Sequence, residues 1–141
     1  MVKDNFGRTQ VERSTMEMER TGALRVLIAD DHPLVREGLA GLLVRYDMQV
    51  VGQARNGEEA VRLHRQCTPD VTIMDLRMPK MDGLTALRLI LKESPLARIV
   101  VLTSFDGEEQ NCLHAGAKAL LLKEAPSKEL VATIRRVAQA S

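Results

Sequence analysis

The sequence predicts a doubly wound α/β fold in which five parallel strands alternate with helices. Short β-rich runs and helical patterns alternate from Ala23 onward, which is typical of βαβ units. The chain has 141 residues, of which 45% are hydrophobic and 28% are charged, as expected for one folded domain. Four of the apolar runs are directly followed by polar residues. These residues lie at the strand ends, where parallel sheets bind ligands.

Five short apolar runs are the expected strands. Each is flanked by residues that favour turns or helix starts, and their boundaries are uncertain by about two to four residues. The expected strand ranges are 24–29, 48–54, 70–74, 98–102 and 118–122.

Helical patterns follow four of these strands clearly. The first begins at Pro33, a residue suited to a first helical turn. The second begins after Asn56, the third follows Gly83 and the last follows Pro126. Their apolar residues recur at helical spacing and are interpreted as core. These residues are Leu34, Val35, Leu39, Leu42, Leu43, Ala60, Val61, Leu63, Cys67, Leu84, Leu87, Ile90, Leu91, Leu130, Val131, Ile134, Val137 and Ala138.

The fourth helix is expected to be short or irregular. Between Phe105 and Gly116 the only large aliphatic residue is Leu113. Its burial would contribute about 1.5 to 3 kcal/mol. Ordering each residue of the segment costs about 1 to 2 kcal/mol. The burial of Leu113 is therefore small beside the entropy cost of ordering the whole segment.

Residues 1–22 differ from the rest of the chain, because four acidic and four basic residues are mixed there with scattered apolar positions and show no sustained helical or alternating period. We expect a flexible N-terminal tail over 1–22 and a folded domain over 23–141. Cys67 and Cys112 lack metal-ligand spacing. No apolar stretch is long enough to span a bilayer, and the N-terminus lacks a signal-peptide pattern. With a net charge of +1, these features predict a cytoplasmic protein that binds neither membrane nor DNA through this chain.

The polar residues at the strand ends are expected to meet. With strand order 2-1-3-4-5, strands one and three are neighbours, so Asp30, Asp31 and Asp75 converge at the switch point. Thr103 and Lys123 close the next two strands. Three carboxylates repel one another unless the Lys123 ammonium or a hard divalent cation such as Mg²⁺ lies among them. Without such partners, at least one carboxylate pKa is expected to be raised.

The strand-end residues occur in an order that resembles a known family. The features are Asp30-Asp31, Asp75-x-x-Met78-Pro79-x-x-Asp82-Gly83, Thr103-Ser104 and Lys123. They resemble the receiver domain of two-component response regulators, from Leu24 to Ser141. The local sequence from Val26 to Leu39 looks most like receivers that precede a helix-turn-helix DNA-binding domain in transcriptional regulators. The resemblance implies a flavodoxin-like (βα)5 sheet of order 2-1-3-4-5.

The resemblance implies a phosphorylation switch. Asp75 would accept a phosphoryl group from a sensor histidine kinase, as an acyl phosphate. A bound Mg²⁺ (or Mn²⁺) would be ligated by Asp31, by Asp75 and by the backbone carbonyl of Arg77, with Asp30 acting through water. The chain would then be a phosphoacceptor that assists its own phosphorylation and dephosphorylation, and not an enzyme in the usual sense.

Further roles follow from the same resemblance. Lys123 would pair with one phosphoryl oxygen, and the Thr103 hydroxyl would donate to another. The Arg77 side chain and Phe105 would flank the site and modulate access of water. A homodimer through the face of the fourth helix, fifth strand and fifth helix is a further partner that the resemblance implies.

Two features depart from the family pattern. The segment from Thr103 to Gly116 is about two residues short, which corresponds to about 200° of helical phase. Leu120 stands where an aromatic residue is usual. We hypothesise that phosphorylation orders a loosely held fourth helix instead of moving an aromatic ring. Equal amide exchange of residues 106–115 with and without a phosphoryl mimic would contradict the hypothesis.

Other functional readings remain. The chain could be a receiver fold used as a stand-alone interaction module without the usual switching, or the receiver part of a longer transcriptional regulator. A hydrolase-like phosphotransferase with an aspartate nucleophile is disfavoured, because haloacid dehalogenase-like enzymes carry an acidic residue where this chain has Arg77. His32 is interpreted as a loop residue, and His64 and His114 as helix-surface residues.

Overall fold

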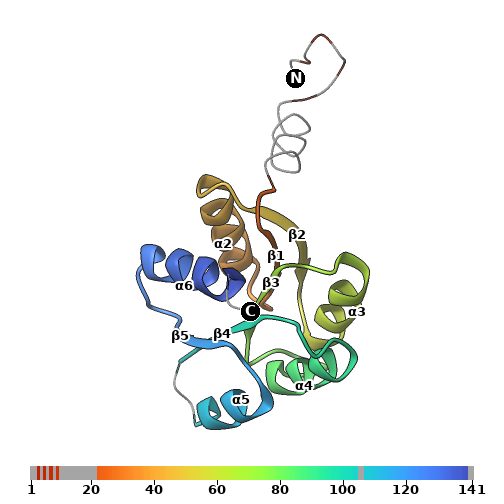
Figure 1. The fold of residues 1–141 in the computed structure, drawn as a ribbon, viewed down its shortest axis with the longest axis vertical. Coiled ribbons are helices and arrows are strands. Elements are labelled where there is room, and N and C mark those ends of the chain that lie inside the picture. The colour runs from red at the N-terminus through yellow and green to blue at the C-terminus, as the bar shows by residue number, and fades with distance from the viewer. Residues whose placement is uncertain are drawn as a thin grey trace.

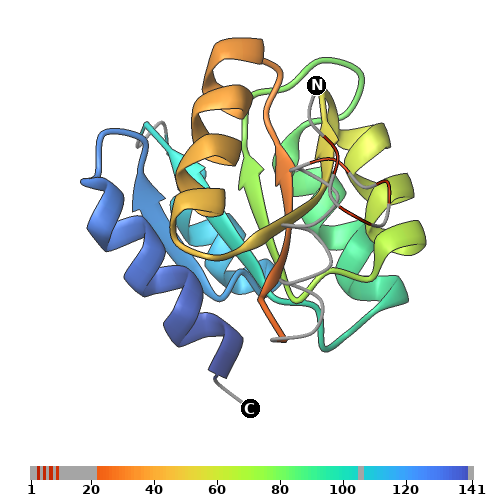
Figure 2. The same ribbon diagram turned by 90° about the horizontal axis from the view of Figure 1, so that it is seen from above.

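Five parallel strands form one sheet in the order β2-β1-β3-β4-β5, with helices on both faces (Figures 1 and 2). The computed structural model describes residues 22–104 and 107–139 and the isolated positions 3, 5, 7 and 9. The expected 1–22 tail and Phe105 therefore lie almost wholly outside the described residues. The strands are β1 (Arg25–Ala29), β2 (Gln49–Ala54), β3 (Val71–Asp75), β4 (Ile99–Thr103) and β5 (Ala119–Leu122). The helices are α2 (Pro33–Arg45), α3 (Gly57–Cys67), α4 (Gly83–Glu93), α5 (Glu109–Ala115) and α6 (Ser127–Gln139).

The predicted fold class is confirmed, and each strand agrees with its expected range to within one residue at either end. Strands β3 and β4 each begin and end one residue later than expected, which changes the position of the polar residues at their ends. Asp75 is the last residue of β3 and Thr103 the last of β4, where they pair in register with Leu102 and Leu122. Both side chains are therefore carried by the sheet itself and not by the loops that follow it.

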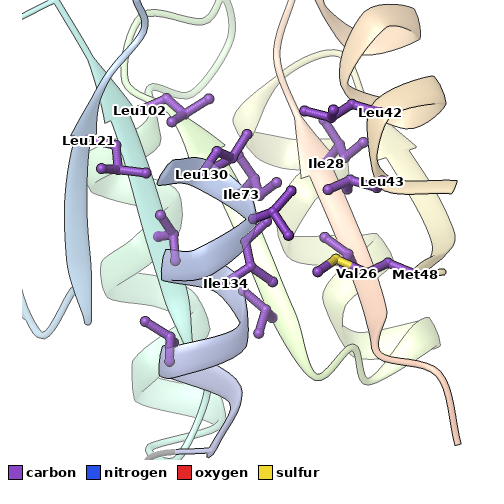
Figure 3. Close-up of a cluster of buried hydrophobic side chains, with 14 of the residues drawn as sticks. Val26, Ile28, Leu42, Leu43, Met48, Ile73, Leu102, Leu121, Leu130 and Ile134 are labelled. Carbon is purple, nitrogen blue, oxygen red and sulfur yellow. The ribbon is translucent and has the colours of Figure 1, made fainter. Parts of the chain in front are cut away.

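Two hydrophobic clusters lie on opposite faces of the sheet, because side chains alternate along each strand. Val26 and Ile28 of β1 face α2 and α6, whereas Ala29 belongs to the cluster beneath α3 and α4. Figure 3 shows Leu130 and Ile134 of α6 extending toward the strands on the first of these faces.

The first turn of α2 does not join the core as predicted. Leu34 is 83% exposed and Val35 is 42% exposed, whereas Leu42 and Leu43 are buried. Helix α2 begins just beyond the end of β1, and its buried residues lie in its second half. The helical period was interpreted correctly, but a period alone does not show where along its length a helix meets the sheet.

The end of α2 contacts α6 through one aromatic ring. The Arg135 side chain donates to the backbone oxygen of Tyr46 at 3.2 Å. The guanidinium carbon also lies 5.8 Å from the centre of the Tyr46 ring, which suits a cation–π contact. These contacts join helices that are far apart in the sequence.

Helix α5 is short, as predicted. It has seven residues, and its N-cap residue Glu108 makes no side-chain capping hydrogen bond. Cys112 is buried, whereas Leu113 is 44% exposed, so the helix buries even less aliphatic surface than its sequence allows. Gly116 ends the helix at φ 113°, a left-handed conformation that favours glycine. The hypothesis that phosphorylation orders this segment stays a prediction.

Helices α3 and α4 are joined by an ion pair, with Arg65 Nη2 2.6 Å from Glu93 Oε1. His64 precedes this arginine and is only 7% exposed, so its assignment to the helix surface was wrong. It lies on the face of α3 that packs inward, since the buried residues of this helix include Ala60, Val61 and His64. Burial lowers the pKa of His64, although the charge of Glu93 partly opposes that shift.

We expect acidification to destabilise the fold through His64. Its folded-state pKa lies below the ordinary value of 6.5, so the unfolded chain binds more protons as the pH falls below about 6.5. The stability contributed by neutral His64 is therefore present above that pH and lost as the pH falls through the folded-state pKa. Urea unfolding at pH 7.5 and 5.5 should show a smaller loss in His64→Leu than in the wild type. Equal losses of stability in the two proteins would contradict the assignment of this pH dependence to His64.

Within the described residues, the helices are all too short or too polar to cross a membrane.

Candidate functional site

Four strand ends place polar side chains at one edge of the sheet. Asp30 follows β1, Asp75 ends β3, Thr103 ends β4 and Lys123 follows β5. Because β1 and β3 are hydrogen-bonded neighbours, the carboxylates of Asp30 and Asp75 come together as predicted. Asp31 lies beside Asp30 and is partly exposed, whereas Asp30 and Asp75 are each 1% exposed.

Asp75 and Lys123 form the central ion pair of the site. Lys123 Nζ lies 2.9 Å from Asp75 Oδ1. Burial raises the pKa of Asp75, and the nearby charge of Asp30 raises it further, while Lys123 and the backbone of Arg77 oppose this. For Lys123, burial lowers the pKa, but the hydrogen bond and charge of Asp75 outweigh it and the net pKa is raised. The sequence predicted a raised carboxylate pKa only in the absence of Lys123 or a cation, through repulsion between carboxylates; here the pKa of Asp75 is raised with Lys123 in place, and burial is the largest cause.

Backbone contacts hold the chain after β1 in place. Asp30 accepts a hydrogen bond from the backbone N–H of His32 at 2.8 Å, and its own N–H donates to the backbone oxygen of Ala54 at 3.0 Å. Arg36 reaches back from the first turns of α2 and donates to the backbone oxygen of Asp30 at 2.7 Å. The carboxylate pair therefore stands on a well-anchored backbone.

The residues present fit a divalent cation. Asp30, Asp31, His32 and Asp75 each offer a ligand atom, and these atoms lie within 4.8 Å of one another. Asp30 Oδ2 is buried and has no hydrogen-bond partner among the described residues. A buried carboxylate oxygen without a partner is costly unless a cation compensates it. Carboxylate oxygens are the ligands that hard divalent cations prefer.

His32 was not predicted as part of this cluster. Its Nδ1 lies 3.1 Å from Asp30 Oδ1 and 3.1 Å from Asp31 Oδ1. The signal in the sequence was its position directly after two aspartates, since imidazole is a common metal ligand. The sequence does not show which way the ring turns, and that orientation decides its role.

The loop from Leu76 to Asp82 is packed tightly beneath the site. Gly83 donates its backbone N–H to the oxygen of Leu76 at 2.9 Å, and Gly57 donates to the oxygen of Met81 at 2.9 Å. A Cβ at Gly83 would lie 2.1 Å from the backbone oxygen of Asp75. Glycine at this position therefore lets α4 begin directly against the end of β3. Asp82 caps that helix by accepting from the N–H of Thr85.

Thr103 lies at the end of β4 and is 1% exposed. Its hydroxyl is 3.5 Å from Glu109 Oε1, a long hydrogen bond, and Glu109 Oε2 accepts from the backbone N–H of Gly107 at 3.1 Å. The Thr103 side chain is thus directed toward the start of α5. Glu109 was not singled out from the sequence, because a separation of six residues does not show whether its side chain reaches Thr103.

Comparison with known proteins gives consistent results. Residues 26–135 match the family described as the response regulator receiver domain. The transcriptional regulatory protein LiaR of Bacillus subtilis is 44% identical over 115 residues, which are 79% of this chain and 54% of LiaR. The chain therefore spans about half the length of the curated relatives it matches.

Solved structures share the fold. The response regulator domain of Thermotoga maritima CheB is 32% identical with a TM-score of 0.78, covering 84% of this chain and 98% of that one. A receiver domain of a sensor histidine kinase from Pseudomonas aeruginosa PAO1, solved with a magnesium ion coordinated in its active site cleft, is 27% identical with a TM-score of 0.77. That match covers 84% of this chain and 99% of the other.

Proposed function

Since this chain belongs to the response regulator receiver domain family, we propose that Asp75 is its phosphoryl acceptor and that a sensor histidine kinase is the donor. The observation that carries the proposal is the position of Asp75, which is buried at the end of β3 with Lys123 Nζ at 2.9 Å and further carboxylates beside it. Receiver domains are switches of two-component systems, and the interaction-module reading without phosphorylation is not favoured.

The proposed reaction is an in-line transfer. A carboxylate oxygen of Asp75 forms a bond to phosphorus while the phosphorus–nitrogen bond of the donor phosphohistidine breaks. Lys123 stabilises negative charge on a phosphoryl oxygen, and it is already positioned by its ion pair with Asp75. The Thr103 hydroxyl would donate to a second phosphoryl oxygen. To do so, it must give up its hydrogen bond to Glu109. In this way the chain assists its own phosphorylation.

The cofactor in this proposal is Mg²⁺ or Mn²⁺. Asp31, Asp75 and the backbone carbonyl of Arg77 would hold it, and Asp30 would act through water. The bound ion supplies neutralisation of charge on the transferring group. The solved receiver domain with magnesium in its active site cleft supports this choice of ion, as does the buried Asp30 Oδ2.

The cellular setting is also a proposal. The relatives are transcriptional regulators about twice the length of the matched segment, so this chain would supply the phosphorylated part of such a regulator in the cytoplasm. DNA binding would belong to another domain. Two copies would pair through α5, β5 and α6, the face formed by the fourth helix, fifth strand and fifth helix counted from β1.

A phosphorylation experiment tests the proposal. The chain is incubated with Mg²⁺ and a small acyl phosphate, and the intact protein and its peptides are analysed by mass spectrometry. We expect an adduct of one phosphoryl group on the peptide that contains Asp75, and we expect a chelator to prevent it. A chain that stays unmodified under these conditions would point instead to the interaction module.

Replacing Asp30 with asparagine tests the cation site separately. Without divalent cations, Asp30→Asn should stabilise the fold by about 1 kcal/mol, because it removes one of the like charges that face each other in a buried site. The wild type should gain about 1.4 kcal/mol when Mg²⁺ is tenfold above its dissociation constant, and the variant should gain much less. Thermal unfolding with and without Mg²⁺ measures both effects. An undiminished Mg²⁺ response in the variant would exclude Asp30 from the site.

A further inference from the structure

We propose that His32 is an additional ligand of the cation site, so that the site binds nitrogen-preferring transition ions such as Ni²⁺ more tightly than Mg²⁺. The proposal rests on the proposed function, because it adds a nitrogen donor to the same carboxylate cluster. It goes beyond the proposed function in two ways. It adds His32, which the sequence analysis interpreted as a loop residue, and it states that the site favours transition ions over Mg²⁺.

The donor atoms of His32 and Asp31 are spaced closely enough to ligate one ion together, with Asp30 beside them to act through water. Neighbouring ligands at right angles, each about 2.1 Å from an octahedral ion, are about 3 Å apart. His32 Nδ1 lies 3.1 Å from Asp30 Oδ1 and 3.1 Å from Asp31 Oδ1. Asp30, Asp31, His32 and Asp75 each offer one ligand atom such that the four atoms lie within 4.8 Å of one another. Little rearrangement is needed to bring one nitrogen and several oxygens around a single ion.

The His32 ring faces the two carboxylates and does not cap α2. His32 is the N-cap residue of α2, yet its side chain makes no capping hydrogen bond. The ring turns toward the two carboxylates instead, while 61% of the side chain remains exposed. In this orientation Nδ1 faces the cluster, and the other ring nitrogen can carry the proton that a neutral imidazole needs.

A buried atom also indicates that the cluster is built for a cation. Asp30 Oδ2 has no hydrogen-bond partner among the described residues, and the Asp30 side chain is 2% exposed. The His32 backbone N–H donates to Asp30 Oδ1, and the ring Nδ1 lies 3.1 Å from the same oxygen, so the other oxygen is left uncompensated.

A nitrogen ligand changes which ions are favoured. Mg²⁺ prefers oxygen ligands and keeps several waters. Imidazole suits Ni²⁺, Cu²⁺ and Zn²⁺, and the affinity of a mixed nitrogen and oxygen site rises along the divalent series toward Cu²⁺. An all-carboxylate site would share part of that trend. The contribution of His32 must therefore be measured as a difference between variants.

Calorimetric titration of the chain without an affinity tag tests the proposal, using Ni²⁺ and Mg²⁺ as probes. Removing an outer partner of a metal ligand already costs about 10- to 100-fold in affinity. We therefore expect His32→Ala to lose at least about tenfold in Ni²⁺ affinity while its Mg²⁺ affinity changes little. His114→Ala is the matched control, because His114 is exposed on α5, away from the strand ends. It should bind both ions as the wild type does.

Each outcome has a distinct meaning. If His32→Ala binds Ni²⁺ as tightly as the wild type, the inference is overturned while the proposed Mg²⁺ site stands. If the wild type binds neither ion, the cation site itself is wrong. A second readout is the resonance of the His32 ring nitrogens: Zn²⁺, which is diamagnetic, should move the Nδ1 signal to the position of a ligated imidazole nitrogen, whereas Mg²⁺ bound to Asp31 should cause a smaller shift. An unchanged His32 resonance in the presence of bound Zn²⁺ would also overturn the inference.

Discussion

Asp75→Asn is expected to abolish the phosphoryl adduct completely. An amide cannot form the acyl phosphate, because its oxygen carries no full negative charge and its nitrogen is not nucleophilic. The substitution keeps the shape of the side chain at the end of β3, where Asp75 is 1% exposed. Mass spectrometry after incubation with Mg²⁺ and an acyl phosphate should therefore show the wild type modified and the variant unmodified.

Asp47→Asn is the matched control for this experiment. Asp47 is exposed and has φ 62°, a left-handed conformation that asparagine tolerates well. It lies between α2 and β2, at the opposite edge of the sheet from Asp75. This variant should be phosphorylated like the wild type. An adduct that persists in Asp75→Asn and is absent from Asp47→Asn would place the acceptor elsewhere.

Gly83→Ala is expected to destabilise the fold by about 3 kcal/mol or more. The new Cβ would lie 2.1 Å from the backbone oxygen of Asp75 and 2.9 Å from Leu76 Cα, and neither backbone atom can move without shifting the end of β3. Overpacking of this kind typically costs about 1 to 3 kcal/mol, and a backbone clash belongs at the upper end. The helix propensity of alanine returns only about 1 kcal/mol. Urea unfolding measures the difference.

Gly38→Ala provides the control of opposite sign. Gly38 lies within α2, and nothing lies within 4 Å of the position that its Cβ would take. Alanine there should stabilise the protein by about 0.5 to 1 kcal/mol, since glycine weakens the interior of a helix. If both variants change stability in the same direction, close packing of Gly83 against β3 is not what limits that position.

The alternation of apolar runs and helical patterns was sufficient to predict the sheet and its helices. It could not show where a helix meets the sheet, so Leu34 was wrongly placed in the core and His64 on the surface. Both errors have one physical cause. Burial depends on the neighbours that the packed structure supplies, and periodicity records only which residues share a helical face.

The convergence of the carboxylates and Lys123 was predicted because the carboxyl ends of parallel strands meet at one edge of the sheet. Asp30, Asp75 and Lys123 are carried there by the strands, so their convergence follows from topology. His32 reaches the same region through the orientation of its ring, and Glu109 through a side-chain contact with Thr103. These depend on local contacts that no repeating pattern encodes, and for that reason the sequence alone missed them.

The contact between Tyr46 and Arg135 has a spectroscopic consequence. Tyr46 is the only tyrosine, and the chain has no tryptophan. Ultraviolet emission under tyrosine excitation therefore reports on the junction of α2 and α6, and not on the carboxylates at the other edge of the sheet. An emission change on phosphorylation would show that the signal crosses the domain, and Arg135→Lys would show whether the stacked guanidinium transmits it.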